Sequence, residues 1–108
     1  MRVLRFIVDG TTIRQDPTCD FSGLFPGREE QMQAELVLSP DWKCRTKVAA
    51  FWSILDKEFP PQVINDDGNC IIPIEALNKV VYKVQVIGRY KNTRIKTDCV
   101  TVYQSGNR

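Results

Sequence analysis

Two neighbouring segments near the end of the chain, in which apolar and polar residues alternate, constrain the fold more than any other feature. In the first segment, Val80–Ile87, the residues expected to face inward are Val80, Tyr82, Val84 and Val86. A polar turn at Gly88–Thr93 leads into the second segment, Arg94–Tyr103. Alternation with a period of two is typical of a strand with one buried face. The two segments therefore predict a pair of long strands that close a β-sandwich.

Three local features refine this prediction. On the last strand Ile95 and Thr97 are out of phase with the valines that follow, which predicts a β-bulge near Asp98-Cys99. Upstream, a short strand beginning at Cys70 is followed by Pro73–Asn78, which predicts one helical turn crossing between the sheets. Tyr82 begins the penultimate strand, where a tyrosine often bonds to the backbone of the preceding corner. We therefore predict a structural corner formed by Leu77 and Tyr82.

The first half of the chain predicts further strands. Asp9-Gly10 lies between two extended segments and predicts a hairpin or a sharply turned strand. The loop Asp16–Glu30 is rich in turn residues, and we expect three apolar side chains to fasten it to the core: Phe21, Leu24 and Phe25. Gln31–Leu38 predicts an antiparallel strand with alternate residues inward. A second hairpin is expected at residues 63–72, around the turn Asn65–Asn69.

The segment Lys43–Phe59 fits two patterns. With a period of two, one face of a strand would carry Cys44, Thr46, Val48, Ala50, Trp52 and Ile54. With a period of 3.6, a helical stripe would carry Val48, Phe51, Trp52, Leu55 and Phe59. We predict a strand through Trp52, because strands flank the segment and consecutive strands usually pair. Sandwich cores commonly hold one tryptophan, so we expect the face that carries Trp52 to be buried. For residues 53–59 the sequence does not decide between strand and helix.

Together these segments predict an all-β fold, an immunoglobulin-like antiparallel β-sandwich of about seven strands with one short helix. A chain of 108 residues suits a single domain. We place that domain at residues 1–103 and expect Gln104–Arg108 to form a polar tail or the start of a linker.

Composition limits the function. Histidine is absent, which removes the commonest general base and metal ligand. The net charge of +2 is small, so we expect no nucleic-acid partner. The chain begins without the pattern of a signal peptide and has no apolar run long enough to span a membrane, so we expect no membrane partner.

The four cysteines, Cys19, Cys44, Cys70 and Cys99, lack the close spacing of a zinc site. We expect free and mostly buried thiols, with Cys70 and Cys99 in the core. Two disulfides in an exported protein are the less favoured alternative.

Several residue groups were weighed as sites. The turn Asn65–Asn69 does not have the ligand spacing of a calcium loop, and the scattered carboxylates form no recognisable pair, so we predict no catalytic residue, metal or cofactor. Trp42, Arg89 and Tyr90 are candidate interface or glycan contacts. Arg89 and Tyr90 belong to a basic cluster, residues 89–96, that could clamp a phosphate backbone and stack a base. A solvated hairpin tip is the favoured interpretation of that cluster.

Three motifs resemble small immunoglobulin-like domains of tailed-phage or prophage virion proteins: CIIPIEAL at Cys70–Leu77, YKVQVIG at Tyr82–Gly88 and RIKT at Arg94–Thr97. The relatives are N-terminal domains of baseplate, tail-fibre or head-fibre proteins of phages of Gram-positive bacteria. Phe6–Gly10, Leu36–Trp42 and Val48–Phe51 fit the earlier part of the same plan, whereas residues 16–30 and 52–63 have no assigned counterpart.

The resemblance implies a non-enzymatic virion module that docks or assembles a fibre or baseplate component. It implies other virion proteins as partners, a homo-oligomer, and assembly in the cytoplasm of the bacterial host. Outward apolar residues such as Val37, Val81 and Ile87 agree with an oligomer. The alternative function is a carbohydrate-binding module that uses Trp42 or Tyr90 as a stacking platform.

Overall fold

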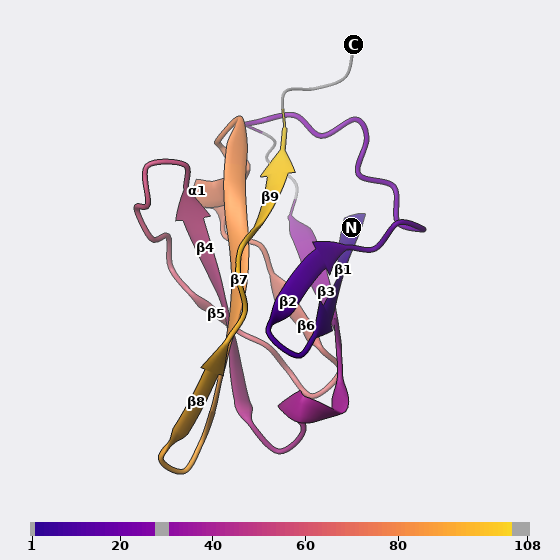
Figure 1. Ribbon diagram of the computed structural model, residues 1–108. Helices are drawn as coiled ribbons and strands as arrows, with labels where there is room; N and C mark the ends of the chain where they lie inside the picture. Colours follow the sequence, from indigo (N-terminus) through magenta and orange to yellow (C-terminus); the bar gives the residue numbers. More distant parts are fainter. Residues whose placement is uncertain (1, 28–30, 105–108) are drawn as a thin grey trace.

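The computed structural model describes residues 2–27 and 31–104, which form two β-sheets packed face to face (Figure 1). The first sheet has the order β2-β1-β3-β6 and consists of β1 (Arg2–Asp9), β2 (Thr12–Gln15), β3 (Met32–Leu38) and β6 (Asn69–Ile71). The second has the order β5-β4-β7-β8, with β9 also paired to β7. Its strands are β4 (Thr46–Ser53), β5 (Gln62–Val63), β7 (Val81–Tyr90), β8 (Thr93–Lys96) and β9 (Val100–Tyr103). The predicted all-β sandwich is confirmed, with nine described strands in place of about seven.

The first sheet is mixed, whereas an antiparallel sandwich was predicted. β1 and β3 run parallel, from Arg2 beside Met32 to Val8 beside Leu38. A parallel pair needs a long crossover connection. Here β2 and the loop that follows it return the chain to the end of the sheet at which β1 began. β3 can therefore run parallel to β1, and both strands direct alternate side chains toward the second sheet.

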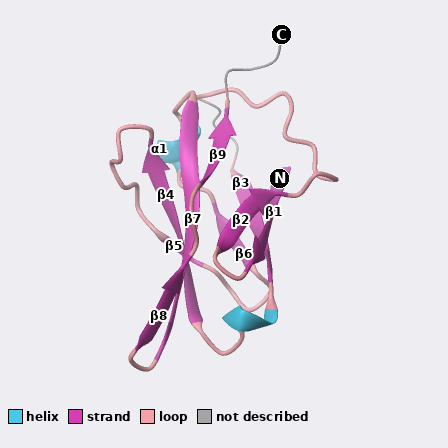
Figure 2. Cartoon of the chain, viewed as in Figure 1, coloured by secondary structure: helices cyan, strands magenta, loops and turns pink. Residues whose placement is uncertain are grey.

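Two short helical segments connect the strands (Figure 2). The 3-10 turn η1 (Pro40–Trp42) lies between β3 and β4. The helix α1 (Ile74–Leu77) joins β6 in the first sheet to β7 in the second, which confirms the predicted crossing turn. Its inward residues Ala76 and Leu77 are fully buried, so the turn also closes one end of the core.

The core lies between the sheets and is built from alternate residues of the long strands. β1 and β3 contribute Leu4, Phe6, Val8, Met32, Ala34 and Leu36. β4, β7 and β9 contribute Ala49, Phe51, Tyr82, Val84, Val86 and Val102. Burial of each large apolar side chain contributes roughly 1.5–3 kcal/mol, so this shared layer is the main force that holds the two sheets together.

The predicted strand in the ambiguous segment is confirmed as β4, but its buried face is the opposite of the one predicted. Phe51 is fully buried, whereas Trp52 is only half-buried and donates an indole hydrogen bond to the Gln85 side chain, 3.2 Å away. The period-two pattern contained apolar residues in both phases. The register with β7, in which Phe51 faces Val84, decides which phase points inward.

The last strand is interrupted at the predicted position. Lys96 on β8 pairs with Ile87, and Val100 on β9 pairs with Val84. Between these two pairs the chain advances four residues from β8 to β9 but only three along β7. This one extra residue is the predicted irregularity near Asp98-Cys99. Asp98 uses the interruption to reach the first sheet, where its carboxylate accepts a hydrogen bond from the backbone N–H of Ile13 at 3.0 Å.

The predicted turns are partly wrong in detail. The first hairpin forms, but Asp9 pairs with Thr12, so the turn residues are Gly10 and Thr11. The expected second hairpin is absent from the described fold, because β5 pairs with β4 in one sheet and β6 pairs with β3 in the other. Residues 65–69 still form a tight turn, in which the Asn65 side chain accepts hydrogen bonds from the backbone N–H groups of residues 67 and 69.

Two of the three predicted loop anchors contact the core. Leu24 is fully buried, and Phe21 packs edge-on against Phe6 with ring centroids 5.5 Å apart. Phe25 is half-exposed. The described part of the loop is also held by the Arg2 guanidinium, which donates to the carbonyls of residues 20 and 22. Residues 28–30, at the end of the predicted loop, lie outside the described residues.

Both ends of the predicted strand pair need correction. Val80, expected inward, is 55% exposed, because β7 begins one residue later at Val81. Gln104, expected at the start of a polar tail, is fully buried beside β7, where its backbone N–H bonds to the Val80 carbonyl. Residues 105–108 lie outside the described residues.

We predict that Gly88→Ala destabilises the protein by about 1–3 kcal/mol, because overpacking forces neighbouring side chains out of position. A Cβ at this position would lie 2.7 Å from Cζ3 of the rigid Trp42 ring. Urea denaturation followed by tryptophan fluorescence measures the change. Arg89→Ala, at the next and exposed position of β7, serves as the control and should change the stability little. Equal stability of the two variants would contradict the proposed contact.

Candidate functional site

Trp42 is not a surface platform, which corrects the prediction of an interface or glycan contact. Its side chain is 1% exposed and packs over Gly88. The indole N–H donates to the carbonyl oxygen of Gly10 at 2.9 Å. The two tryptophans have thus exchanged their expected places: Trp42 is in the core and Trp52 lies on the outer face of β4. The short η1 turn directs Trp42 inward, and a sequence pattern of strands does not reveal this.

Arg89 and Tyr90 lie on the surface, as predicted, at the end of the hairpin formed by β7 and β8. Tyr90 is 46% exposed, and the Lys91 ammonium lies 5.3 Å from the centre of its ring. Arg89 pairs directly with Arg94 across the hairpin. The hairpin extends toward one end of the molecule, away from the end where β9 and the C-terminal side of the described chain lie (Figure 1).

The other end of the sandwich exposes apolar side chains. Leu55 is 86% exposed, Tyr103 67% and Ile54 65%, and Val80 lies beside them with its side chain half-exposed. An open groove of about 340 Å³ runs between the β4–β5 turn and the start of β7. Its lining consists of Ser53, Ile54, Leu55, Lys57, Phe59, Lys79, Val80 and Val81. We call this surface, including Tyr103, the apolar end.

Ile54 and Leu55 were missed as surface residues because the sequence did not decide between strand and helix for residues 53–59. β4 ends at Ser53, and the chain then turns with Asp56 in the left-handed region at φ 65°. The turn is fixed by the Ser53 hydroxyl, which accepts hydrogen bonds from the backbone N–H groups of residues 55 and 57. The one sequence signal of this turn was the pair of turn-forming residues Ser53 and Asp56 on either side of Ile54-Leu55.

The apolar end carries charged groups of both signs at its rim. A second shallow depression joins Lys57, Glu58, Glu75 and Lys79 beside the buried ring of Phe59. Nearby, the Lys83 ammonium contacts the Asp56 carboxylate at 2.6 Å, and this hydrogen bond raises the pKa of Lys83. The rim can therefore form ion pairs with either sign of charge on a bound surface.

The predicted corner of Leu77 and Tyr82 is wrong as to its hydrogen bond. Both side chains are buried in the core, but within residues 2–27 and 31–104 the Tyr82 hydroxyl has no hydrogen-bond partner. Burial raises the pKa of Tyr82 well above its usual range. The bond to the corner comes instead from the Gln104 side chain, whose amide nitrogen donates to the carbonyls of Leu77 at 3.0 Å and Lys79 at 2.8 Å.

The four cysteines are free, as predicted, but only one of them is buried. Cys70 lies in the core, and burial raises the pKa of its thiol to about 12. Cys99 is exposed, not in the core as predicted, because it lies in the interruption between β8 and β9. Cys44 is also exposed, and Cys19 is half-buried beside the backbone N–H of Arg5.

No group of three or more potential metal ligands occurs among residues 2–27 and 31–104. The carboxylates weighed in the sequence have separate local roles: Asp98 bonds to Ile13 and Asp56 pairs with Lys83. Within the same described ranges, no helix is long and apolar enough to cross a membrane. Among the described residues, two surfaces combine several exposed side chains of one kind: the apolar end and the hairpin of β7 and β8.

Comparison with protein-family models, with curated proteins and with solved structures finds no match to this chain.

We predict opposite effects for two substitutions at the corner below β9. Gln104→Leu should destabilise the protein by about 1–3 kcal/mol, because it removes the side-chain hydrogen bonds to the Leu77 and Lys79 carbonyls and leaves Leu77 only its bond from the Gly27 N–H. Tyr82→Phe should be neutral or stabilising, because it removes a buried hydroxyl that has no partner among the described residues. Thermal unfolding followed by circular dichroism measures both. A loss of stability in Tyr82→Phe equal to that in Gln104→Leu would restore Tyr82 as the corner residue.

Proposed function

We propose that this protein is a non-enzymatic structural module of a phage virion, which assembles with further copies of itself through the apolar end. The observation that carries the assembly is the set of exposed side chains at that end, Ile54, Leu55, Val80 and Tyr103. Contiguous exposed apolar surface in a small domain marks an interaction site.

The size of the patch supports a stable contact. Each large apolar side chain that becomes buried contributes roughly 1.5–3 kcal/mol. Four such side chains together offset a substantial part of the entropy lost on association, which is about 4–15 kcal/mol. The open groove between the β4–β5 turn and β7 gives a protruding side chain such as Leu55 a concave surface to enter.

The rim favours a second copy of this chain as the occupant. Lys57 and Lys79 lie at the rim together with Glu58 and Glu75. In a symmetric interface the same patch meets itself, so each lysine of one copy can face a glutamate of the other. A partner of one predominant charge would leave half of these rim groups facing like charge.

The virion part of the proposal rests on the resemblance carried by Cys70–Leu77, Tyr82–Gly88 and Arg94–Thr97. In the fold these motifs form β6 with α1, most of β7, and β8, which follow one another along the chain and span both sheets. The carbohydrate-binding alternative has lost one of its two platforms, because Trp42 is buried. Tyr90 remains exposed, but it is flanked by cations, not by a second aromatic platform.

We predict that Leu55→Ser shifts the protein from oligomer to monomer, because it removes the most exposed apolar side chain of the patch. Sedimentation velocity at increasing protein concentration should show a weakening of self-association of roughly tenfold or more. The matched control is Val37→Ser on β3. From the sequence Val37 was expected to support an oligomer, but the structure places it on the other sheet, outside the apolar end, so its removal should leave association unchanged. A monomer at high micromolar concentration in the unmodified protein would contradict the assembly.

We also predict that the protein is a component of mature particles. Phage particles induced from a host that encodes the chain, purified on a density gradient and analysed by mass spectrometry, should contain it at a constant ratio to the major structural proteins. Enrichment of the chain in the particle-free supernatant, with none in the particle band, would contradict the virion role while leaving the self-association result intact.

A further inference from the structure

The small net charge of the chain conceals a strong separation of charge. At the hairpin end five cations gather, Arg45, Arg89, Lys91, Arg94 and Lys96, which we call the basic patch. Residues 88–96 contain no Asp or Glu. Of the 15 Lys and Arg residues in the chain, 10 remain outside the patch against 13 Asp and Glu, a balance of −3. The patch and the rest of the molecule therefore differ in sign.

Pairing across the hairpin places like charges side by side. Arg89 and Arg94 are directly opposite each other, and Lys96 follows on the same face, opposite Ile87. Like charges in directly opposite positions destabilise a sheet. Among the described residues no carboxylate forms an ion pair with any member of the patch. A bound anion would convert this repulsion into attraction.

Arg45 extends the patch onto the other face of the hairpin. Its guanidinium donates to the Thr93 hydroxyl at 3.2 Å and to the Asp41 carbonyl at 3.2 Å, so it is held beside the hairpin end. Thr93 pairs with Tyr90, whose ring is 46% exposed with the Lys91 ammonium 5.3 Å from its centre. Cations thus flank an exposed aromatic ring on both sides of the hairpin.

We propose that the basic patch and Tyr90 bind single-stranded nucleic acid, with the cations on its phosphates and the Tyr90 ring stacked on a base. Each arginine side chain can bind a phosphate through two parallel hydrogen bonds. Proteins that bind single strands without sequence preference combine a positively charged groove with aromatic rings on which the bases stack. The expectation of no nucleic-acid partner came from the total charge, which does not describe how the charge is distributed.

A single strand fits this end better than a duplex. β4 pairs with β7 as far as Arg89, so only residues 90–93 extend beyond a three-stranded sheet. Two residues on each strand reach about 7 Å, less than the depth of about 8.5 Å of the major groove of DNA. The exposed ring of Tyr90 can stack only on a base that is not already stacked in a duplex.

The test is fluorescence anisotropy with a labelled single-stranded DNA of about 20 nucleotides and mixed sequence, at about 50–200 mM salt. At the upper end of this salt range we expect a Kd of about 1–100 μM, as for non-specific binding at physiological salt. With about four phosphate contacts, the logarithm of the affinity should fall against the logarithm of the salt concentration with a slope of about −3. Absence of saturable binding up to millimolar protein at the lowest salt would overturn the proposal.

Removing positive charge inside and outside the basic patch shows whether binding depends on the patch or on the net charge of the protein. Arg89→Gln combined with Arg94→Gln should weaken binding roughly tenfold and make the salt slope shallower by about 1.4, the value for two lost contacts. The control is Arg14→Gln, which removes one exposed positive charge from β2 in the first sheet and should leave affinity unchanged, whereas Arg94→Gln alone should weaken it. An equal loss in Arg14→Gln and Arg94→Gln would overturn the assignment to the patch.

Two further arms decide the kind of ligand. Tyr90→Ser should weaken binding roughly fivefold or more, whereas Tyr90→Phe, which keeps the aromatic ring, should not. A duplex of the same sequence should bind more weakly than the single strand. Equal or tighter binding of the duplex, no effect of Tyr90→Ser, or equally tight binding of poly-glutamate with the same number of charges would each overturn the proposal.

Because Arg89 and Arg94 repel each other, the variant that lacks both should melt at the same temperature as the unmodified protein or higher. This result excludes unfolding as the cause of lost binding.

Discussion

The packing of Trp42 against Gly88 is the contact on which the arrangement of the two sheets depends. The indole ring lies against the backbone of β7 in the second sheet, and its N–H bonds to the Gly10 carbonyl in the β1–β2 turn of the first. The Trp42 side chain therefore contacts both sheets, and it supplies a hydrogen bond to the Gly10 carbonyl. Glycine is required at residue 88 because a Cβ would overlap the ring, and the close approach it permits seals the core at the hairpin end.

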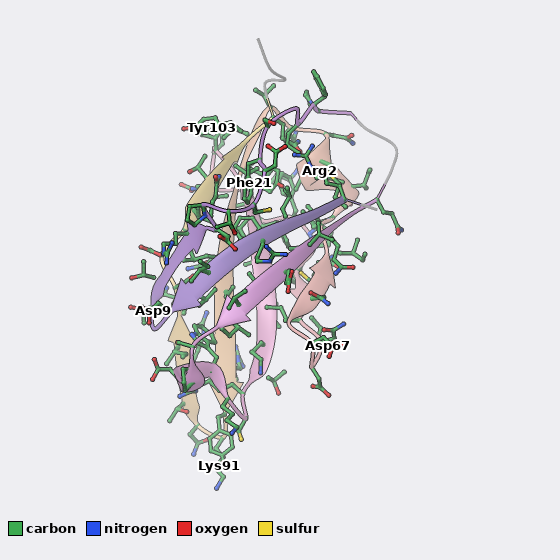
Figure 3. All side chains as sticks on the ribbon, turned by 90° about the vertical axis from the view of Figure 1, so that its right-hand side faces the viewer. Arg2, Asp9, Phe21, Asp67, Lys91 and Tyr103 are labelled. Carbon is green, nitrogen blue, oxygen red and sulfur yellow. The ribbon has the colours of Figure 1, made fainter. Side chains whose placement is uncertain are left out.

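The opposite end is closed by different means, and this difference produces the two surfaces. There the helix α1, the Gln104 side chain and the start of β7 complete the core through hydrogen bonds to the Leu77 and Lys79 carbonyls. The β4–β5 turn adds Ile54 and Leu55 outside that closed core, where no described residue covers them. The apolar end thus offers surface for self-association, whereas the hairpin end offers cations without carboxylate partners. Figure 3 places Lys91 and Tyr103 at these two ends.

Much of the architecture could be predicted because the strongest strands carry their burial pattern in the sequence. The alternation in β3 and β7, the crossing turn of α1 and the interruption near Asp98-Cys99 follow from local spacing and are all present. Details that depend on a partner strand were wrong. The phase of β4, the parallel pairing of β1 with β3, and the assignment of β5 and β6 to different sheets are fixed by contacts between segments distant in the chain.

The sequence by itself determined that the chain forms a β-sandwich, because periodicity is a local property of the chain. It also identified the cluster at residues 89–96, although not its significance. Only the tertiary structure decided which aromatic residues are available. Trp42 is turned inward by η1 onto Gly88, Tyr90 is left outside, and Gln104 in place of Tyr82 bonds to the corner. Exposure and the direct opposition of Arg89 to Arg94 depend on register between strands, and register is set by the packing of the whole core.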